Sequence, residues 1–274
     1  MPDKQLNDTT LEEILHVIKS QYGYDFNDYA HASIMRRVQR CMEMSKTKNV
    51  FDLKFRLTNE PDFFNWFLES VTVNVTEMFR DPEFYKDIRT KVIPKLASYP
   101  FIKIWHAGCA TGEEVYSMAI LLKEEGLLER TRIYATDLNP ANLEKARKGI
   151  IPMSYMKNYT QNYLLSGGKS DFSEYYTARY GNSLIRKDLL TNILFSQHNL
   201  VTDQVFNEFQ LVICRNVLIY FNKKLQDRVL RLFYDSMSPL GYLSLGIKES
   251  LLFSPLRDNF QTISANNKIF RRKS

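Results

Sequence analysis

Hydrophobic residues recur every three or four positions in the first part of the chain, which is the spacing of one face of an α-helix. Two such series are Leu11, Ile14, Leu15 and Ile18, and then Ile34, Val38 and Met42. Glycine occurs only once between residues 10 and 70, at Gly23. The pattern predicts a small all-helical domain over residues 1–70.

The segment that follows has a different character. Val71–Thr76 is rich in β-branched residues, which favours an extended backbone. Pro82 comes directly after Asp81 and suits the first turn of a helix. We therefore expect a linker and a connecting helix over residues 71–98.

From residue 99 onward, apolar runs of strand length alternate with helical segments. The expected strands are Phe101–Trp105, Arg132–Thr136, Phe209–Cys214 and Tyr242–Ile247, and the expected helices are Glu113–Glu125, Pro140–Lys148 and Lys223–Met237. Consecutive strand–helix units imply a parallel sheet. Two closing strands, Phe260–Ser264 and Lys268–Arg272, are expected to pair antiparallel at its edge. The pattern predicts a doubly wound α/β domain over residues 99–274, with a mostly parallel sheet.

A segment at about residues 150–190 interrupts this alternation. It is rich in Tyr, Ser and Gly, and long insertions in compact domains are usually functional or mobile. We interpret it as an inserted subdomain and a candidate partner surface, whose target the sequence does not identify.

Composition argues against several classes of protein. No apolar run approaches the roughly 20 residues that span a bilayer, and the N-terminal residues lack the basic-then-apolar layout of a signal peptide. We therefore expect a cytoplasmic protein with no membrane insertion. The three cysteines and four scattered histidines lack the spacing of metal ligands, so neither a disulfide framework nor a metal site is indicated.

Positive charge is concentrated in one part of the helical domain. The whole chain carries a formal net charge of +6, and between Arg36 and Arg56 seven basic residues outnumber two acidic ones. Such a cluster is either a solvated helix face or a docking surface for an acidic partner. The sequence does not indicate an oligomeric state.

A small-residue loop at 107–112 follows the first predicted strand of the α/β domain. Ligands of doubly wound folds bind beyond the carboxyl ends of the strands, and glycine lets the backbone approach a ligand closely. Asp137 ends the second strand, where a carboxylate can accept hydrogen bonds from both hydroxyls of a ribose. The loop lacks the G-x-G-x-x-G pattern that holds a pyrophosphate. These features favour a nucleoside cofactor without phosphates, such as S-adenosylmethionine; the alternatives are a purely structural turn and a helix cap at Asp137.

Four segments, in order, resemble the motifs of the CheR family of chemotaxis receptor protein-glutamate O-methyltransferases. They are Asn74–Arg80, Ile104–Ser117, Ala135–Asn139 and Ile213–Phe221. The resemblance covers nearly the whole chain. It implies transfer of a methyl group from S-adenosylmethionine to glutamate side chains of methyl-accepting chemotaxis receptors, which leaves S-adenosylhomocysteine.

The resemblance also implies a set of functional residues. The cofactor site would comprise Asn74, Thr76, Arg80, Gly108, Glu113, Asp137, Asn199, Leu200, Arg215 and Asn216. Arg215 and Tyr220 are hypothesised to orient the accepting glutamate, although Tyr220 could instead pack over the sheet. A basic helix face with Arg36, Arg37 and Arg40 would dock on the acidic helical cytoplasmic domain of the receptor.

One departure and three competing functions accompany this interpretation. Gly246–Ser250 reads G-I-K-E-S where the family usually has a G-H-S-E run, which loosens the substrate assignment. A nucleic-acid methyltransferase is disfavoured, because the chain has neither an N/D-P-P-Y tetrapeptide nor a Pro-Cys pair. A methyltransferase of this fold acting on another protein or a small carboxylic acid, and a non-catalytic receptor-docking adaptor, remain alternatives.

Overall fold

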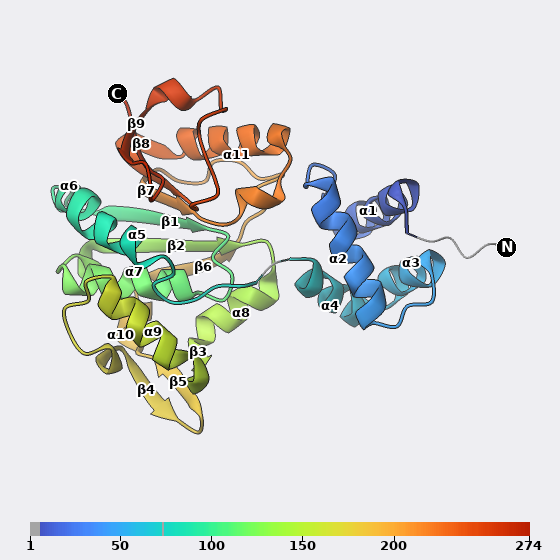
Figure 1. The fold of residues 1–274 in the computed structure, drawn as a ribbon, viewed down its shortest axis with the longest axis horizontal. Coiled ribbons are helices and arrows are strands. Elements are labelled where there is room, and N and C mark those ends of the chain that lie inside the picture. Colours follow the sequence, from blue (N-terminus) through green and yellow to red (C-terminus); the bar gives the residue numbers. More distant parts are fainter. Residues whose placement is uncertain (1–5, 73) are drawn as a thin grey trace. The chain divides into compact units, whose positions relative to one another are not determined.

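The computed structural model describes residues 6–72 and 74–274, so expectations that fall on residues 1–5 and Val73 lie outside the described residues. The chain forms two compact units, drawn in Figure 1. Unit 1 contains residues up to 74 together with 219–228, and unit 2 contains residues 75–218 and 229–274.

Unit 1 is built from helices. They are α1 (Asp8–Tyr22), α2 (His31–Met44), α3 (Val50–Asn59) and α4 (Pro61–Val71). The apolar series on α1 is buried as the spacing predicts, and on α2 the buried residue after Val38 is Cys41, whereas Met42 is half-buried. Gly23 ends α1 with a positive φ of 78°, a backbone conformation that glycine adopts without strain. The all-helical prediction is confirmed.

The connecting segment differs in part from its prediction. Val71 still belongs to α4, so the expected extended backbone begins only at Thr72, with φ −79° and ψ 142°. Residues 74–77 belong to no helix or strand, as expected of a linker. The expected helix after Asp81 is present. It continues as α5 (Pro82–Asp87), the π-helical turn η1 (Ile88–Val92) and α6 (Ile93–Leu96).

Unit 2 contains the predicted sheet, with strand order β6-β2-β1-β7-β8-β10-β9. The strands are β1 (Ile102–Ala107), β2 (Thr131–Asp137), β6 (Ile193–Gln197), β7 (Phe209–Cys214), β8 (Met237–Leu245), β9 (Phe260–Ser264) and β10 (Ile269–Arg272). Neighbours from β6 to β8 are parallel, and β10 pairs antiparallel with β8 and β9. The doubly wound fold with an antiparallel edge is confirmed.

Helices cover both faces of this sheet, as Figure 1 shows for α7 (Glu113–Glu124) and α11 (Lys223–Asp235). The other helix of the predicted alternation is α8 (Pro140–Lys148), with the expected bounds. Shorter helices and turns are η2 (Leu128–Arg130), η3 (Phe172–Tyr175), α10 (Lys187–Leu190), η4 (Leu218–Tyr220) and η5 (Arg257–Asn259). The centre of α7 is buried on all sides, which explains its nearly continuous apolar run from Val115 to Leu122.

The interrupting segment forms its own small sheet. Its elements are β3 (Ile150–Pro152), α9 (Met153–Leu165), β4 (Tyr176–Arg179) and β5 (Asn182–Ile185), with strand order β3-β5-β4. Several of its aromatic residues join the core of unit 2, namely Tyr159, Tyr163, Phe172 and Tyr175. Tyr155 and Tyr180 remain exposed. Most of the aromatic residues of this segment therefore pack into the core of unit 2.

No helix among residues 6–72 and 74–274 is long and apolar enough to cross a membrane. The same residues contain no cluster of His, Cys, Asp and Glu that could hold a metal ion. Cys41, Cys109 and Cys214 are buried free thiols.

Candidate functional site

Three loops of unit 2 begin side by side at one edge of the sheet. β1 lies between β2 and β7 and is parallel to both, so the carboxyl ends of these strands are neighbours. The chain reverses its winding direction at β1, which is where doubly wound folds bind their ligands. Loop 107–112, Asp137 and Arg215 all lie at this carboxyl edge.

The loop after β1 is held against β2 by its backbone. The N–H groups of Gly108 and Cys109 both donate to the carbonyl of Thr136, at 2.8 and 2.9 Å. Gly108, Ala110 and Gly112 have positive φ angles of 78°, 47° and 97°. Three left-handed residues so close together produce the tight turn that brings α7 back over the sheet.

The two glycines are required by protein packing, and the expected close approach of a ligand to this loop stays a prediction. A Cβ on Gly108 would lie 2.5 Å from Cγ2 of Val217, and one on Gly112 would lie 2.7 Å from the ring of Tyr116. Both distances are shorter than a van der Waals contact. Loop geometry and side-chain contacts therefore require glycine at both positions.

Asp137 fixes the same loop through its carboxylate. Oδ2 accepts a hydrogen bond from the N–H of Ala110 at 2.9 Å, and Oδ1 accepts from the N–H of Asn139 at 2.9 Å and the amide of Asn142 at 3.1 Å. Burial raises the pKa of Asp137, and these hydrogen bonds oppose that shift. Asn139, not Asp137, caps α8 by accepting from Ala141. Asp137 therefore organises loop 107–112, and its contact with a ribose stays a prediction.

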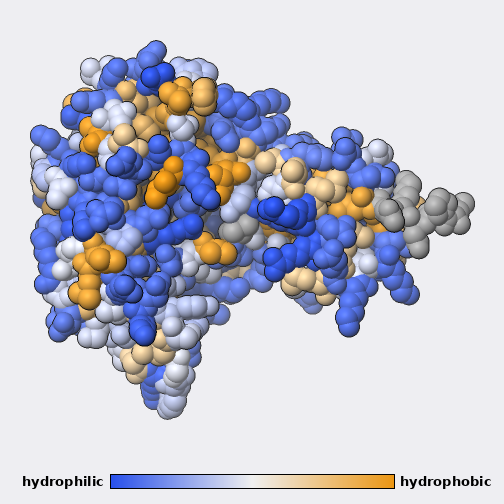
Figure 2. All heavy atoms as spheres, in the orientation of Figure 1, coloured by the Kyte–Doolittle hydropathy of each residue, from blue (hydrophilic) through white to orange (hydrophobic). Residues whose placement is uncertain are grey.

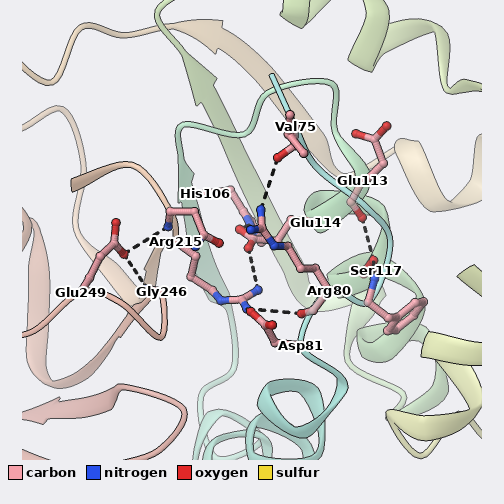
Figure 3. A network of polar contacts seen from close by, with 12 residues as sticks. Val75, Arg80, Asp81, His106, Glu113, Glu114, Ser117, Arg215, Gly246 and Glu249 are labelled. Atoms are coloured by element: carbon pink, nitrogen blue, oxygen red, sulfur yellow. Dashed lines mark hydrogen bonds and ion pairs between the residues drawn. The ribbon is translucent and has the colours of Figure 1, made fainter. Parts of the chain in front are cut away.

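Glu113 stands at the first position of α7, where a carboxylate interacts favourably with the helix dipole. Its Oε2 accepts from the hydroxyl of Thr111 at 2.6 Å, and burial raises its pKa. Its backbone carbonyl accepts from Ser117 at 2.7 Å, and Ser117 in turn accepts from the N–H of Phe79 at 2.9 Å (Figure 3). The segment before α5 is thus tied to the helix that carries Glu113.

Arg215 lies in a buried network of charges, shown in Figure 3. Its Nη2 is 2.5 Å from Oδ2 of Asp81, its Nη1 is 3.1 Å from Oε2 of Glu114, and its side chain is only 2% exposed. The guanidinium also stacks on Phe84, 4.1 Å from the ring centroid. Burial opposes the charge of Glu114, but hydrogen bonds from His106 and Arg215 outweigh it, so the pKa of Glu114 is lowered.

Carboxylates of the protein itself therefore compensate the positive charge of the buried Arg215. This arrangement links the end of β7 to the start of α5 and to α7. Arg215 therefore fixes the positions of these three segments within unit 2. Its contact with the accepting glutamate stays a prediction.

Glu249 is a site residue that sequence reasoning missed. Its carboxylate accepts from the N–H groups of Gly246, Asn216 and Val217 at 2.6, 3.1 and 2.8 Å, and it is 4% exposed. Asn216 has a positive φ of 62°, a conformation that this anchor stabilises. The signal was present: Glu249 is the acidic residue retained where Ile247 and Lys248 depart from the G-H-S-E run.

The remaining cofactor-site candidates of unit 2 lie in two segments. Asn199 and Leu200 follow β6, and the N–H of the preceding His198 donates to the carbonyl of Asp137 at 3.2 Å, which places both at the carboxyl edge. Thr76 is half-buried, and Arg80 donates to the carbonyl of Val75 at 3.3 Å. The carbonyl of Arg80 accepts from Arg215 at 3.3 Å, so segments far apart in sequence meet at this edge.

Asn74 and Tyr220 belong to unit 1 and are described within it. The amide of Asn74 donates to the carbonyl of Glu69 at 3.3 Å. Tyr220 accepts from the N–H of Ala30 at 2.8 Å through its carbonyl, and its ring lies 4.2 Å from the guanidinium of Arg37. Their predicted roles beside the cofactor and the substrate stay predictions.

The three arginines predicted to dock on a receptor differ in their surroundings. Arg37 donates to the carbonyl of Val71 at 2.8 Å and stacks on Tyr220, and burial lowers its pKa. Arg36 and Arg40 are exposed on α2, and within residues 6–72 and 74–274 neither is found in an ion pair. Of the three predicted docking residues, Arg36 and Arg40 expose their guanidinium groups to solvent, and docking on a receptor stays a prediction.

Family models match two consecutive parts of the chain. The "CheR methyltransferase, all-alpha domain" matches residues 9–72, and the "CheR methyltransferase, SAM binding domain" matches residues 74–269. The chain belongs to the CheR methyltransferase family. The resemblance found in the sequence is confirmed, and so is S-adenosylmethionine as the cofactor.

Full-length relatives carry matching names. The chain is 48% identical over 272 residues to "Putative methyltransferase Cher3" of Pseudomonas putida, covering 99% of this chain and 100% of that protein. It is 29% identical to the "Chemotaxis protein methyltransferase" of Listeria innocua, over 86% of this chain and 88% of that protein. It is also 29% identical to the Salmonella typhimurium protein of the same name, over 96% and 92%. This CheR chain thus spans nearly the whole length of these relatives.

Proposed function

We propose that this CheR chain transfers the methyl group of S-adenosylmethionine to glutamate side chains of chemotaxis receptors and so forms methyl esters. The observation that carries the proposal is the match of both CheR domains over almost the entire chain, together with full-length relatives named chemotaxis protein methyltransferases. A cytoplasmic location and a partner with an acidic helical cytoplasmic domain belong to the same proposal.

The carboxyl edge of unit 2 fits this cofactor chemically. Asp137 and Glu113 provide carboxylates for hydroxyl and ammonium groups, and the loop at 107–112 follows β1 at the switch point. We assign the binding of the cofactor to these residues with Thr76, Arg80, Asn199 and Leu200. When bound, the cofactor supplies an electrophilic methyl group on a positively charged sulfur.

The reaction needs positioning more than acid or base catalysis. An ionised glutamate oxygen forms the new bond to the methyl carbon as the carbon–sulfur bond breaks, and the bonding electrons remain on sulfur, so no proton is transferred. The protein must hold oxygen, carbon and sulfur in line and replace water around the carboxylate. We assign the orientation of the glutamate to Arg215 and Tyr220, with Arg215 itself held by Asp81 and Glu114.

Methyl transfer to purified receptor cytoplasmic domains tests the function. With cofactor labelled in its methyl group, we expect label on the receptor that mild alkali releases, because methyl esters hydrolyse in alkali. Cofactor binding without transfer would favour another acceptor or a non-catalytic adaptor. Ile247 and Lys248 are exposed and stand where the family usually has the His and Ser of the G-H-S-E run. This difference is the observation that favours a methyl acceptor other than a chemotaxis receptor.

Charge reversal on α2 tests the docking surface. We expect Arg36→Glu/Arg40→Glu to weaken receptor binding by about tenfold at low salt and to flatten its salt dependence, because exposed cations attract an acidic partner over roughly a Debye length. Binding is measured by calorimetry at several salt concentrations.

The matched control is Lys95→Glu/Lys187→Glu, which reverses the same number of charges on exposed lysines of unit 2. It should leave the receptor affinity nearly unchanged. Equal losses in both double variants would mean that net charge, and not the α2 face, governs binding.

A further inference from the structure

An exposed apolar rim follows β8 in unit 2. Ile247, Leu252 and Phe253 are 49%, 50% and 79% exposed, and the exposed cation Lys248 lies among them. Most of the face of unit 2 drawn in Figure 2 is hydrophilic, with hydrophobic residues in small separate patches. Exposed apolar residues clustered in one short segment often mark an interaction site. We call these four residues the 247–253 rim.

The rim belongs to a loop with a defined conformation. Four residues within and directly after this segment anchor it, because Glu249, Leu251, Ser254 and Leu256 are all buried. Backbone hydrogen bonds from Glu249 to Gly246 at 2.8 Å and from Ser254 to Leu251 at 2.9 Å close two turns in it. Because the anchors fix the backbone, the rim side chains are directed outward and lose little conformational freedom on binding a partner.

The same anchors place the rim beside the reaction site. Cys214 pairs with Leu245 in the parallel β7–β8 ladder, so the loops that begin at Arg215 and Gly246 leave the sheet side by side. Glu249 then binds the N–H groups of Asn216, Val217 and Gly246. The rim is thus continuous with the carboxyl edge that holds the cofactor loop.

We infer that the 247–253 rim contacts the receptor helix next to the glutamate that is methylated, and that it helps to select this substrate. The inference rests on the proposed function. An acidic helix that also carries apolar residues fits the rim, since Lys248 complements its carboxylates while Ile247, Leu252 and Phe253 cover its apolar positions. The residues that depart from the usual G-H-S-E run are then specificity determinants.

Steady-state kinetics with the full chain and a receptor cytoplasmic domain test the rim. For Ile247→Ser/Leu252→Ser/Phe253→Ser at saturating cofactor, we expect KM for the receptor to rise by about tenfold or more, because truncating buried apolar anchors of an interface typically has effects of this size. Turnover at saturating receptor and the affinity for S-adenosylhomocysteine should change less than about twofold.

Phe101→Ser is the matched control. Phe101 is 50% exposed and directly precedes β1, at the opposite edge of the sheet, so its replacement should leave KM unchanged. An unchanged KM in the triple variant would overturn the inference that the rim contacts the receptor. A parallel loss of S-adenosylhomocysteine affinity would also overturn it, because the loop would then belong to the cofactor site. Failure of the unmodified chain to methylate any receptor domain overturns the proposed function, and with it this partner.

Discussion

Replacing Asp137 by alanine should lower the affinity for S-adenosylhomocysteine by about two to three orders of magnitude. The change removes the carboxylate that accepts hydrogen bonds from Ala110, Asn139 and Asn142 and so loosens loop 107–112, and each hydrogen bond to a charged group contributes about 1.5–3 kcal/mol. The same carboxylate is the one that we assign to the ribose. Calorimetric titration of the purified variant with S-adenosylhomocysteine measures the effect.

Asp171→Ala provides the comparison for this variant, because Asp171 is an exposed carboxylate of unit 2 whose side chain makes no cap hydrogen bond. Its affinity should stay within about twofold of the original. Asp137→Asn should also bind weakly, since an amide nitrogen would face one of the backbone donors. Unchanged affinity in both Asp137 variants would remove Asp137 from the cofactor site.

Arg215→Ala should lower the free energy of unfolding by about 3–5 kcal/mol, the typical cost of removing one partner from a buried ion pair. Asp81 and Glu114 would lose their shared cation, and Phe84 the group stacked on it. Chemical denaturation followed by circular dichroism measures the loss. Arg257→Ala, at an exposed arginine, should change stability by less than about 0.5 kcal/mol.

The effect of Arg215→Ala should depend on pH in a defined direction. The pKa of Glu114 is lowered from its ordinary value of 4.5, so its ionised form stabilises the folded state above that pH and this contribution is lost as the pH falls through the folded-state pKa. The stability difference between the two proteins should therefore shrink below about pH 4.5. A difference that stays constant through acid pH would contradict the ion-pair account.

Arg215→Lys separates stability from orientation of the substrate. Lysine keeps the charge but lacks the planar fork that reaches Asp81 and Glu114 together. If Arg215 also orients the glutamate, this variant should bind cofactor normally and lose turnover. Normal turnover would mean that Arg215 holds segments of unit 2 together but does not orient the glutamate.

Local sequence patterns predicted the strands whose apolar runs are long and clearly bounded. The expected bounds of Phe209–Cys214 and Phe260–Ser264 agree with β7 and β9. β6 (Ile193–Gln197) was missed because it is short, lies at a sheet edge and is only partly buried. Its extended conformation depends more on pairing with β2 than on a strand pattern in its own sequence.

Local sequence patterns also predicted only part of the candidate site. Asp137 was found because it ends a recognisable strand, and Glu113 because it begins a recognisable helix. The partners of Arg215 and Glu249 were not found, since Asp81 lies 134 positions from Arg215 and Val217 lies 32 from Glu249. Such contacts follow from which strands become neighbours, and no local spacing reveals them.

Identification of the modified atom tests the central claim most directly. A receptor cytoplasmic domain is incubated with this CheR chain and cofactor, digested and analysed by tandem mass spectrometry. We predict a mass increase of one methylene group on glutamate side chains, absent with Asp137→Ala and removed by mild alkali. Methyl groups on any other residue type, or an unmodified receptor with a chain that binds the cofactor normally, would contradict the account.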